Sequence, residues 1–368
     1  GDASEIAFPD RERRRQQRRH WLDFMYWYHE SQVDLAEEGI RIVRKYFPRI
    51  LLEAGLGFGD DNPLCALDRT AVCRRLAQYK PFGIRSTHAA VNRGDWNQAY
   101  WFYKRMAPVA HRYGAAFGTE PPGGDLSVLE LHQQIFEDAS AGVDYVYSYF
   151  QNFMLLPDTV DRFRAALRPG ERPCVDIGIL YPTAQLLLDM ETTPEWQIPF
   201  CSVARDCLDY DVVDENMIAW GMLDDYRVLV QTSGGMLETQ SLQAIDRWIR
   251  AGGLLVARGD RPLRTVEEDA SLPQQWYSSS PTEYPDGTKS YAVDRGQVVL
   301  LEGPRRLNDL IGQVVGALLR YADACLGRRP LRGFDGAADG IWTTEFPSGK
   351  LTYDAETRVT RFTPAGRE

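Results

Sequence analysis

The feature that most constrains this chain is a regular alternation of strand-like apolar runs and helix-like amphipathic segments in its first half. Strand-like runs stand at residues 1–7, 50–56, 82–91, 115–119 and 143–150, most of them about 30 residues apart, with a helical pattern after each. A repeat of this kind joins parallel strands through helices. The sequence therefore predicts an α/β fold, either an open doubly wound sheet or part of a (β/α)8 TIM barrel.

The alternation restarts with a different spacing after Pro173. Further strand-like runs stand at residues 175–181, 211–213, 227–231, 254–257 and 296–301, with helical patterns at 237–250 and 307–326. The last segment is rich in Gly, Thr and aromatic residues and carries a hairpin signal at Pro347-Ser348-Gly349. We therefore expect one α/β part over 1–172, a second over 173–328 and a small β segment over 329–368.

Composition excludes several classes of protein. The formal net charge of −10 disfavours nucleic acid as a partner, and the basic run at residues 11–19 is interpreted as a solvated helix face. No apolar run is long enough to span a membrane. The six cysteines are too sparse for a disulfide scaffold, which favours a reducing cytoplasm. No spacing indicates a metal site, no cofactor is expected, and Asp60 breaks the glycine pattern of a dinucleotide loop.

Two carboxylates follow strand-like runs three repeats apart, where the carboxyl ends of parallel strands carry ligands. Glu5 is expected at the end of the first strand, and Glu120 follows the fourth run, directed by Pro121-Pro122. Retaining glycosidases use two such carboxylates about 5–5.5 Å apart, one as acid/base and one as nucleophile. Other polar side chains near strand ends are expected to bind a carbohydrate substrate, the last three from one strand face: Glu53, His88, Tyr147, Tyr149 and Gln151.

The second part also carries a family resemblance. The segments at residues 209–215, 221–230, 245–249 and 251–256 resemble the amidotransferase-like trimerisation domain of family 42 β-galactosidases and their relatives. In those enzymes a TIM barrel precedes this domain and a small β domain follows it. The resemblance implies retaining hydrolysis of β-glycosides, with Glu5 as acid/base after barrel strand four and Glu120 as nucleophile after barrel strand seven.

This register has three consequences. Residues 1–172 would be the C-terminal portion of the barrel, strands four to eight, so we expect the chain to be a fragment. Ser4 stands where the wider clan usually has an Asn that binds the sugar 2-hydroxyl. The second part lacks His, and the turn at residues 232–235 lacks Cys, so it cannot catalyse amide transfer and is expected to support a homo-oligomer, possibly a trimer, through exposed apolar residues at 196–200.

Three functions remain open at this stage. The first is a retaining β-glycosidase, and the second is a non-catalytic carbohydrate-binding or scaffolding relative. The third is a nucleotide-binding α/β protein, which is disfavoured because no phosphate-binding loop is present. The first two share a fold and differ only in what Glu5 and Glu120 do.

Overall fold

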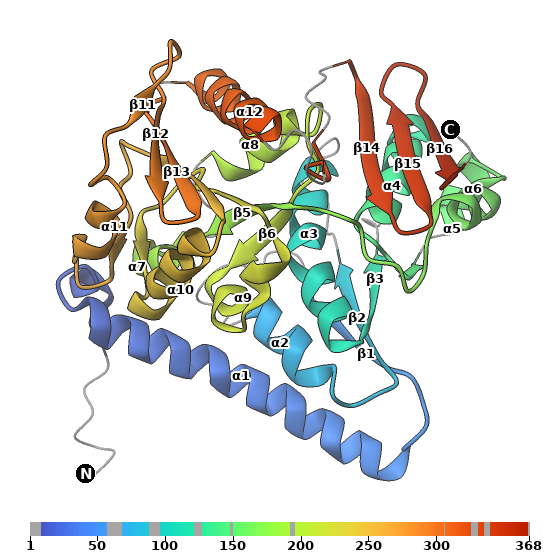
Figure 1. The fold of residues 1–368 in the computed structure, drawn as a ribbon. Coiled ribbons are helices and arrows are strands. Elements are labelled where there is room, and N and C mark those ends of the chain that lie inside the picture. The colour runs from blue at the N-terminus through green and yellow to red at the C-terminus, as the bar shows by residue number, and fades with distance from the viewer. Residues whose placement is uncertain are drawn as a thin grey trace, which may run out of the picture.

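The computed structural model describes residues 9–56, 68–87, 96–120, 127–147, 150–191, 196–304, 306–324, 330–334 and 339–366. The strands form three larger sheets, with the seven-stranded sheet to the left in Figure 1 and a three-stranded sheet at the upper right. The expected first strand at residues 1–7 lies outside the described residues. A long helix, α1 (Arg18–Tyr46), runs beneath both of the parallel sheets (Figure 1).

The first sheet has four parallel strands in chain order: β1 (Leu52–Leu56), β2 (Phe82–Thr87), β3 (Ala116–Glu120) and β4 (Tyr145–Val146). Helices α2 (Arg69–Leu76), α3 (Trp96–Tyr113) and α4 (Val128–Ser140) connect the strands, and α5 (Phe150–Leu155) and α6 (Thr159–Ala166) follow. The strands expected at 50–56, 82–91 and 115–119 are confirmed as β1, β2 and β3.

The strand expected at residues 143–150 is wrong in extent. Only Tyr145 and Val146 pair with β3, and the backbone is already helical at Phe150. Among the described residues β4 has no neighbour on its other side, so no second ladder of hydrogen bonds extends it. Gln151 therefore lies in a helix, and the expectation that Tyr147, Tyr149 and Gln151 share one strand face does not hold.

Local side-chain and backbone signals mark the ends of the helices that cover the first sheet. The side chain of Asp68 accepts a hydrogen bond from the backbone N–H of Ala71 and caps α2. Ser127 and Glu130 form a reciprocal capping box at the start of α4. Gly142, with φ of 78°, ends the same helix in a left-handed conformation that other residues adopt only with strain. These signals set the residues at which α2 and α4 begin and at which α4 ends.

The second sheet has the order β11-β12-β13-β9-β7-β5-β6, in which the five strands from β13 to β6 are parallel. Numbered along the chain, these five strands follow the order 2-1-3-4-5. Their bounds are β5 (Ile177–Tyr181), β6 (Asp211–Asp214), β7 (Val228–Val230), β9 (Leu254–Arg258) and β13 (Gly296–Leu301), while β12 (Lys289–Val293) and β11 (Thr282–Glu283) are antiparallel additions. A separate pair joins β8 (Met236–Leu237) to β10 (Arg264–Thr265).

The helices around the second sheet are α7 (Thr183–Asp189), α8 (Gln197–Ala204), α9 (Glu215–Ala219), α10 (Thr239–Arg250), α11 (Ser271–Gln275) and α12 (Leu307–Ala324). Sequence patterns predicted α10 and α12 but not the short helices. The apolar surface expected at residues 196–200 is present only in part. Phe200 is fully buried and Gln197 donates hydrogen bonds inside the core, whereas Pro199 is exposed and Trp196 and Ile198 are half-buried.

The small β segment is an antiparallel sheet of β14 (Ile341–Phe346), β15 (Gly349–Asp354) and β16 (Val359–Pro364). Its inner residues Phe346 and Tyr353 share an apolar cluster with Phe136 of α4 and Phe163 of α6. The rings of Phe136 and Tyr353 are stacked with their centroids 5.2 Å apart. This sheet therefore covers the helices of the first sheet, close to the C-terminus (Figure 1).

Buried ion pairs join the two parallel sheets through α3. Nζ of Lys104 lies 3.0 Å from Oδ1 of Asp211 and 3.4 Å from Oδ1 of Asp209. The guanidinium of Arg105 lies 3.1 Å from Oδ2 of Asp214. Removing one partner of a buried pair leaves an unpaired charge in a medium that solvates it poorly, so these pairs favour one relative placement of α3 and β6.

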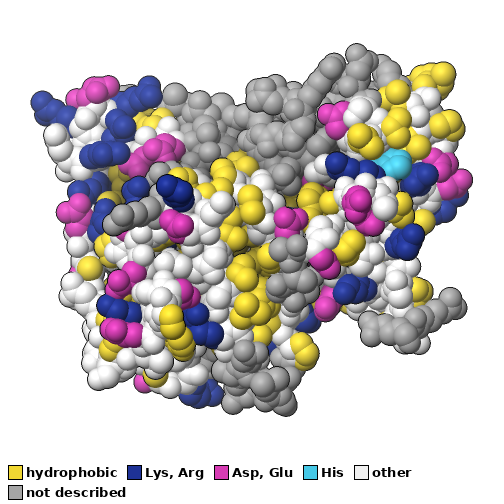
Figure 2. All heavy atoms as spheres, turned by 90° about the horizontal axis from the view of Figure 1, so that it is seen from above, with side chains coloured by type: hydrophobic (Ala, Val, Ile, Leu, Met, Phe, Trp, Pro, Cys, Tyr) yellow, Lys and Arg dark blue, Asp and Glu magenta, His cyan; other side chains and the backbone are white. Residues whose placement is uncertain are grey.

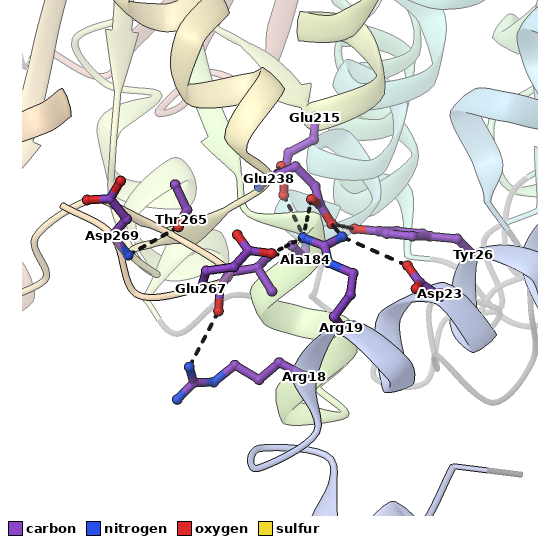
Figure 3. Close-up of polar contacts among 11 residues, drawn as sticks. Arg18, Arg19, Asp23, Tyr26, Ala184, Glu215, Glu238, Thr265, Glu267 and Asp269 are labelled. Atoms are coloured by element: carbon purple, nitrogen blue, oxygen red, sulfur yellow. Dashed lines mark hydrogen bonds and ion pairs between the residues drawn. The ribbon is translucent and has the colours of Figure 1, made fainter. Parts of the chain in front are cut away.

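Helix α1 ties the same two sheets together from below. Trp21 is 4% exposed and packs against α7, where its indole N–H donates to the backbone carbonyl of Leu187 at 2.9 Å. Figure 3 shows Arg19 between Glu238 and Glu267, with Tyr26 donating to Glu238. Part of the basic run at residues 11–19 therefore contacts the second sheet's helices. No helix in the described ranges has both the length and the apolar composition that crossing a bilayer requires.

Removing the buried indole of α1 should destabilise the protein. We expect Trp21→Ala to lower the free energy of unfolding by about 3–5 kcal/mol, because it empties a buried ring site and breaks the bond to Leu187. Trp27→Ala on the same helix is the control, since the Trp27 side chain is 62% exposed and should cost less than about 1 kcal/mol. Urea unfolding of both variants measures the difference, and equal losses would contradict the packing described for α1.

Candidate functional site

One face of the four-stranded sheet carries the polar residues of the candidate site. Alternation along the strands puts Phe82, Ile84 and Phe117 into the core with α3, and turns their neighbours the other way. The neighbours are Glu53 and Gly55 on β1, Gly83 and Arg85 on β2, and Gly118 and Glu120 on β3. We call this surface, with Tyr145 and Tyr147, the Arg85 face.

Arg85 lies at the centre of this face and pairs with two carboxylates. Its Nε is 3.0 Å from Oε1 of Glu53, and its Nη1 is 3.0 Å from Oε2 of Glu120. The Tyr147 ring lies against the guanidinium, with 5.1 Å between the guanidinium carbon and the ring centroid. One cation thus joins carboxylates from β1 and β3, strands separated by β2.

Tyr145 crosses the same face beneath Arg85. Its hydroxyl donates a 2.7 Å hydrogen bond to Oε2 of Glu53, although β4 and β1 are at opposite ends of the sheet. The ring has room because Gly118 and Gly83 have no side chains. A Cβ on Gly118 would lie 2.2 Å from the Tyr145 ring, and one on Gly83 would lie 2.8 Å from its hydroxyl oxygen. Burial and the bond to Glu53 raise the pKa of the Tyr145 hydroxyl, so it remains a donor.

The three charged side chains of the Arg85 face are only partly open to solvent. The exposed fractions are 14% for Glu120, 22% for Arg85 and 31% for Glu53. Partial burial strengthens a charge interaction over its value in bulk water. Two carboxylates and one guanidinium also leave this cluster with an excess of one negative charge, so it suits a substrate without a negative charge at this position.

The opposite side of β3 contains a buried carboxyl group. Asp138 on α4 is fully buried, and burial raises its pKa to about 7, opposed by hydrogen bonds to its side chain. One of these comes from Nε2 of Gln134 at 3.2 Å. The carboxyl group lies among core residues and not on the Arg85 face, so it belongs to the packing of α4.

The structure brings together only some of the residues predicted from the sequence. Glu53, Glu120 and Tyr147 lie around Arg85, as described above. Gln151 is in α5 with its side chain outside the described residues. Three others lie wholly outside the described residues: Glu5, His88 and Tyr149. The separation of the Glu5 and Glu120 carboxyl groups is therefore not part of the described geometry.

Sequence reasoning missed Arg85 and Tyr145 as members of the site. Arg85 alternates with Gly83 along β2, so period-two reasoning puts both on one face and could have found it. Tyr145 carries no comparable signal, because its role depends on glycines that lie on two other strands. The ion pair of Arg85 with Glu120 also depends on register across two strands, which local patterns do not contain.

A larger hollow lies elsewhere. A groove of about 960 Å³ runs between α1 and helices α2, α9 and α10, and among the described residues none of those predicted for the site lines it. Its aromatic residues include Trp220, whose ring centroid lies 4.6 Å from the guanidinium carbon of Arg74. Among the described residues, no group of three or more His, Cys, Asp or Glu side chains could hold a metal ion. We place the candidate site on the Arg85 face, because charges pair there and Glu120 ends β3, at the strand edge where ligands bind in parallel folds. Glu53, expected near the carboxyl end of its strand, is instead the second residue of β1.

Comparison with known proteins gives a similarity of fold. No family model matches the sequence, and no curated protein matches it. Among solved structures, the β-galactosidase of Rahnella sp. is 11% identical with a TM-score of 0.67, covering 95% of this chain and 65% of that one. The β-galactosidase of the haloarchaeon Halorubrum lacusprofundi is 11% identical with a TM-score of 0.64, covering 91% of this chain and 63% of that one.

A third structure, a GH42 β-galactosidase from G. stearothermophilus, is 11% identical with a TM-score of 0.62 over 90% of this chain and 61% of that one. The chain therefore spans less than two thirds of the length of these structures. The protein is an α/β protein with parallel sheets. Its fold resembles that of family 42 β-galactosidases, which confirms the resemblance proposed from residues 209–256.

The packing of the Tyr145 ring on Gly118 can be tested by adding a single methyl group at Gly118. We expect Gly118→Ala to destabilise the protein by about 1–3 kcal/mol, because the new Cβ must displace the Tyr145 ring. Gly39→Ala is the control, since nothing lies within 4 Å of its Cβ and Ala favours a helix interior by up to about 1 kcal/mol. Thermal unfolding compares the two, and a harmless Gly118→Ala would refute the packing of Tyr145.

The buried carboxyl of Asp138 should make stability depend on pH. Its folded-state pKa of about 7 exceeds the ordinary value, so the folded protein binds this proton more tightly than the unfolded chain. Stability from this group is full below about pH 4 and is lost as the pH rises to about 7. Asp138→Asn should therefore gain stability over wild type, on the order of 2–4 kcal/mol at pH 8 and less at pH 5.

Thermal unfolding of Asp138→Asn and wild type across this pH range makes the measurement. Asp161→Asn is the control, because Asp161 is 78% exposed in its ion pair with Arg164. The control should show no comparable divergence with pH. A difference between Asp138→Asn and wild type that stays constant from pH 5 to pH 8 would mean that Asp138 is ionised in the fold.

Proposed function

We propose that the protein is a retaining glycoside hydrolase that acts on β-glycosides in the manner of a β-galactosidase. The observation that carries this proposal is the place of Glu120, at the carboxyl end of β3 on the Arg85 face, in a fold similar to that of GH42 β-galactosidases. Glu120 is 14% exposed, so a substrate on this face would meet a carboxylate that is largely sheltered from water.

The proposed mechanism uses two carboxyl groups in two steps. Glu120 attacks the anomeric carbon, and the bond to the leaving oxygen breaks as Glu5 gives that oxygen its proton. Glu5 then takes a proton from water, which attacks the same carbon and releases Glu120 as a carboxylate. Tyr147 is 53% exposed and offers an aromatic surface to the sugar. His88, Tyr149 and Gln151 remain proposed substrate contacts.

The parts of the chain can be interpreted on the same basis. We propose that residues 1–172 are the C-terminal portion of a TIM barrel, with β1 to β4 as its strands five to eight. The parallel order 2-1-3-4-5 in residues 173–328 is the order of flavodoxin-like sheets and supports an amidotransferase-like domain there. Residues 329–368 would be its small β appendage.

We also propose a homo-oligomer, possibly a trimer. Apolar side chains form a band across the centre of the upper face in Figure 2, with charged side chains on both flanks. Val203 of α8 is 43% exposed and Leu319 of α12 is 44% exposed, and both helices lie toward this end of the molecule (Figure 1). Exposed apolar patches of this kind are typical of subunit contacts.

Alanine variants of the two glutamates test the mechanism. Glu120→Ala should lower kcat by at least about 10⁴-fold on an aryl β-galactoside, because no covalent intermediate can form. Azide should restore turnover by occupying the space of the carboxylate, and it should give a product of inverted configuration. Glu5→Ala should spare the first step for dinitrophenyl glycosides, whose leaving group needs no proton.

Both assays use the full-length protein that contains this chain. Asp161→Ala is the control, because its exposed carboxylate pairs only at the surface, with Arg164. If both glutamate variants keep the rate of the parent protein, neither residue is catalytic. Sugar binding without any turnover by the parent would favour the alternative, a non-catalytic carbohydrate-binding or scaffolding relative.

A further inference from the structure

We propose that Arg85 is a positioning residue for Glu120, and that Glu53 serves as the anchor of Arg85 rather than as a sugar ligand. This inference rests on the proposed function, because it gives Glu120 the role of nucleophile. It changes the role of Glu53, which sequence reasoning assigned to the substrate. Arg85 has no assigned role in the resemblance from which Glu120 was identified.

The guanidinium lies between two carboxylates. Its Nε and Nη1 atoms each lie 3.0 Å from an oxygen, the first from Glu53 and the second from Glu120. The contact of Nε with Glu53 is an ion pair, since Nε makes no hydrogen bond. A planar guanidinium spreads its charge over three nitrogens, so it can pair with carboxylates on two sides at once. A lysine ammonium is a single point of charge and cannot fix both directions.

The surroundings of Arg85 restrict its side chain on several sides. Tyr147 lies over one face of the guanidinium, and the hydroxyl of Tyr145 holds Glu53 from the far side at 2.7 Å. Gly55 leaves the space that Nη2 occupies, since a Cβ there would lie 3.1 Å away. The orientation of Arg85 is therefore set by groups on β1, by Tyr145 on β4 and by Tyr147 just after it.

The two carboxylates give Arg85 a partner at every stage of a double displacement. When Glu120 forms an ester bond to the anomeric carbon, it loses its negative charge, and Arg85 remains neutralised by Glu53. When water breaks that bond, the charge returns to Glu120 beside a cation already in place. Such a fixed arrangement stabilises the departing carboxylate without reorganisation. Glu53 is required because, while Glu120 is esterified, a partly buried guanidinium with no carboxylate beside it would be energetically unfavourable.

Kinetics of Arg85→Met, Arg85→Lys and Glu53→Gln test the proposal. Arg85→Met should lower kcat/KM about tenfold to a hundredfold, as expected for loss of one charge-assisted hydrogen bond. The loss should fall on kcat with little change in KM, because Arg85 acts through Glu120 and not on the sugar. Arg85→Lys should recover only part of the rate, since an ammonium cannot pair with both carboxylates in the same way.

Glu53→Gln separates an anchor from a sugar ligand. As an anchor, Glu53 acts through Glu120, so its variant should lower kcat with little change in KM. As a sugar ligand its loss would raise KM, which would contradict the proposal. Arg41→Met is the control, since Arg41 is 63% exposed in its pair with Glu38, and it should change neither quantity.

Folding is monitored by thermal unfolding, and a variant that unfolds below the assay temperature is replaced by Tyr145→Phe, which removes only the hydroxyl that holds Glu53. Tyr145→Phe should lower kcat with little change in KM, as Glu53→Gln does, because it removes the hydrogen bond that holds Glu53. If Glu120→Ala is rescued by azide while Arg85→Met keeps the kcat of the parent protein, this inference is wrong and the proposed function stands. If Glu120→Ala keeps the parent rate, both are wrong.

Discussion

The arrangement of the candidate site depends on one cation placed between two carboxylates of a parallel sheet. Arg85 on β2 contacts Glu53 on β1 and Glu120 on β3, each at 3.0 Å. Adjacent strands in a sheet lie about 4.8 Å apart, so the carboxylates of alternate strands would not meet without a longer side chain between them. The guanidinium supplies that length and offsets one of the two negative charges. Partial burial then makes the interaction stronger than a surface ion pair.

Glycines make this arrangement possible on one face while the other face builds the core. Tyr145 crosses three strands because Gly118 and Gly83 have no Cβ to block its ring. On the other side of β3, Phe117 is fully buried in the main apolar cluster. Because side chains alternate along β3, its five residues supply core packing on one face and the candidate site on the other. The ion pairs of Lys104 and Arg105 then fix α3, which covers the packed side, against the second sheet.

Period and spacing were enough to predict β1, β2 and β3, as well as α3, because each is a clear apolar run or an amphipathic segment with a capping residue. They failed at residues 143–150, because β-branched and aromatic residues there resemble a strand, whereas pairing with β3 ends at Val146. Glu120 was found from its place at a strand end, which the structure confirms. Glu53 was expected near a carboxyl end but is the second residue of β1. Period-two alternation could have placed Arg85 on this face, but its pairing with Glu53 and Glu120 depends on register between strands, which no local pattern contains. The basic run at residues 11–19 likewise shows no sign in sequence of its contacts with Glu238 and Glu267.

The central claim is that Glu120 is the residue that bonds to the sugar. A 2-deoxy-2-fluoro-β-galactoside with a dinitrophenolate leaving group tests it most directly, because the fluorine slows the second step more than the first and lets the intermediate accumulate. Incubation of the full-length protein, followed by proteolysis and mass spectrometry, should find one fluorosugar on the peptide that contains Glu120, and none in Glu120→Ala. A sugar attached to any other residue, or an unmodified protein that still turns over the parent galactoside, would contradict the account.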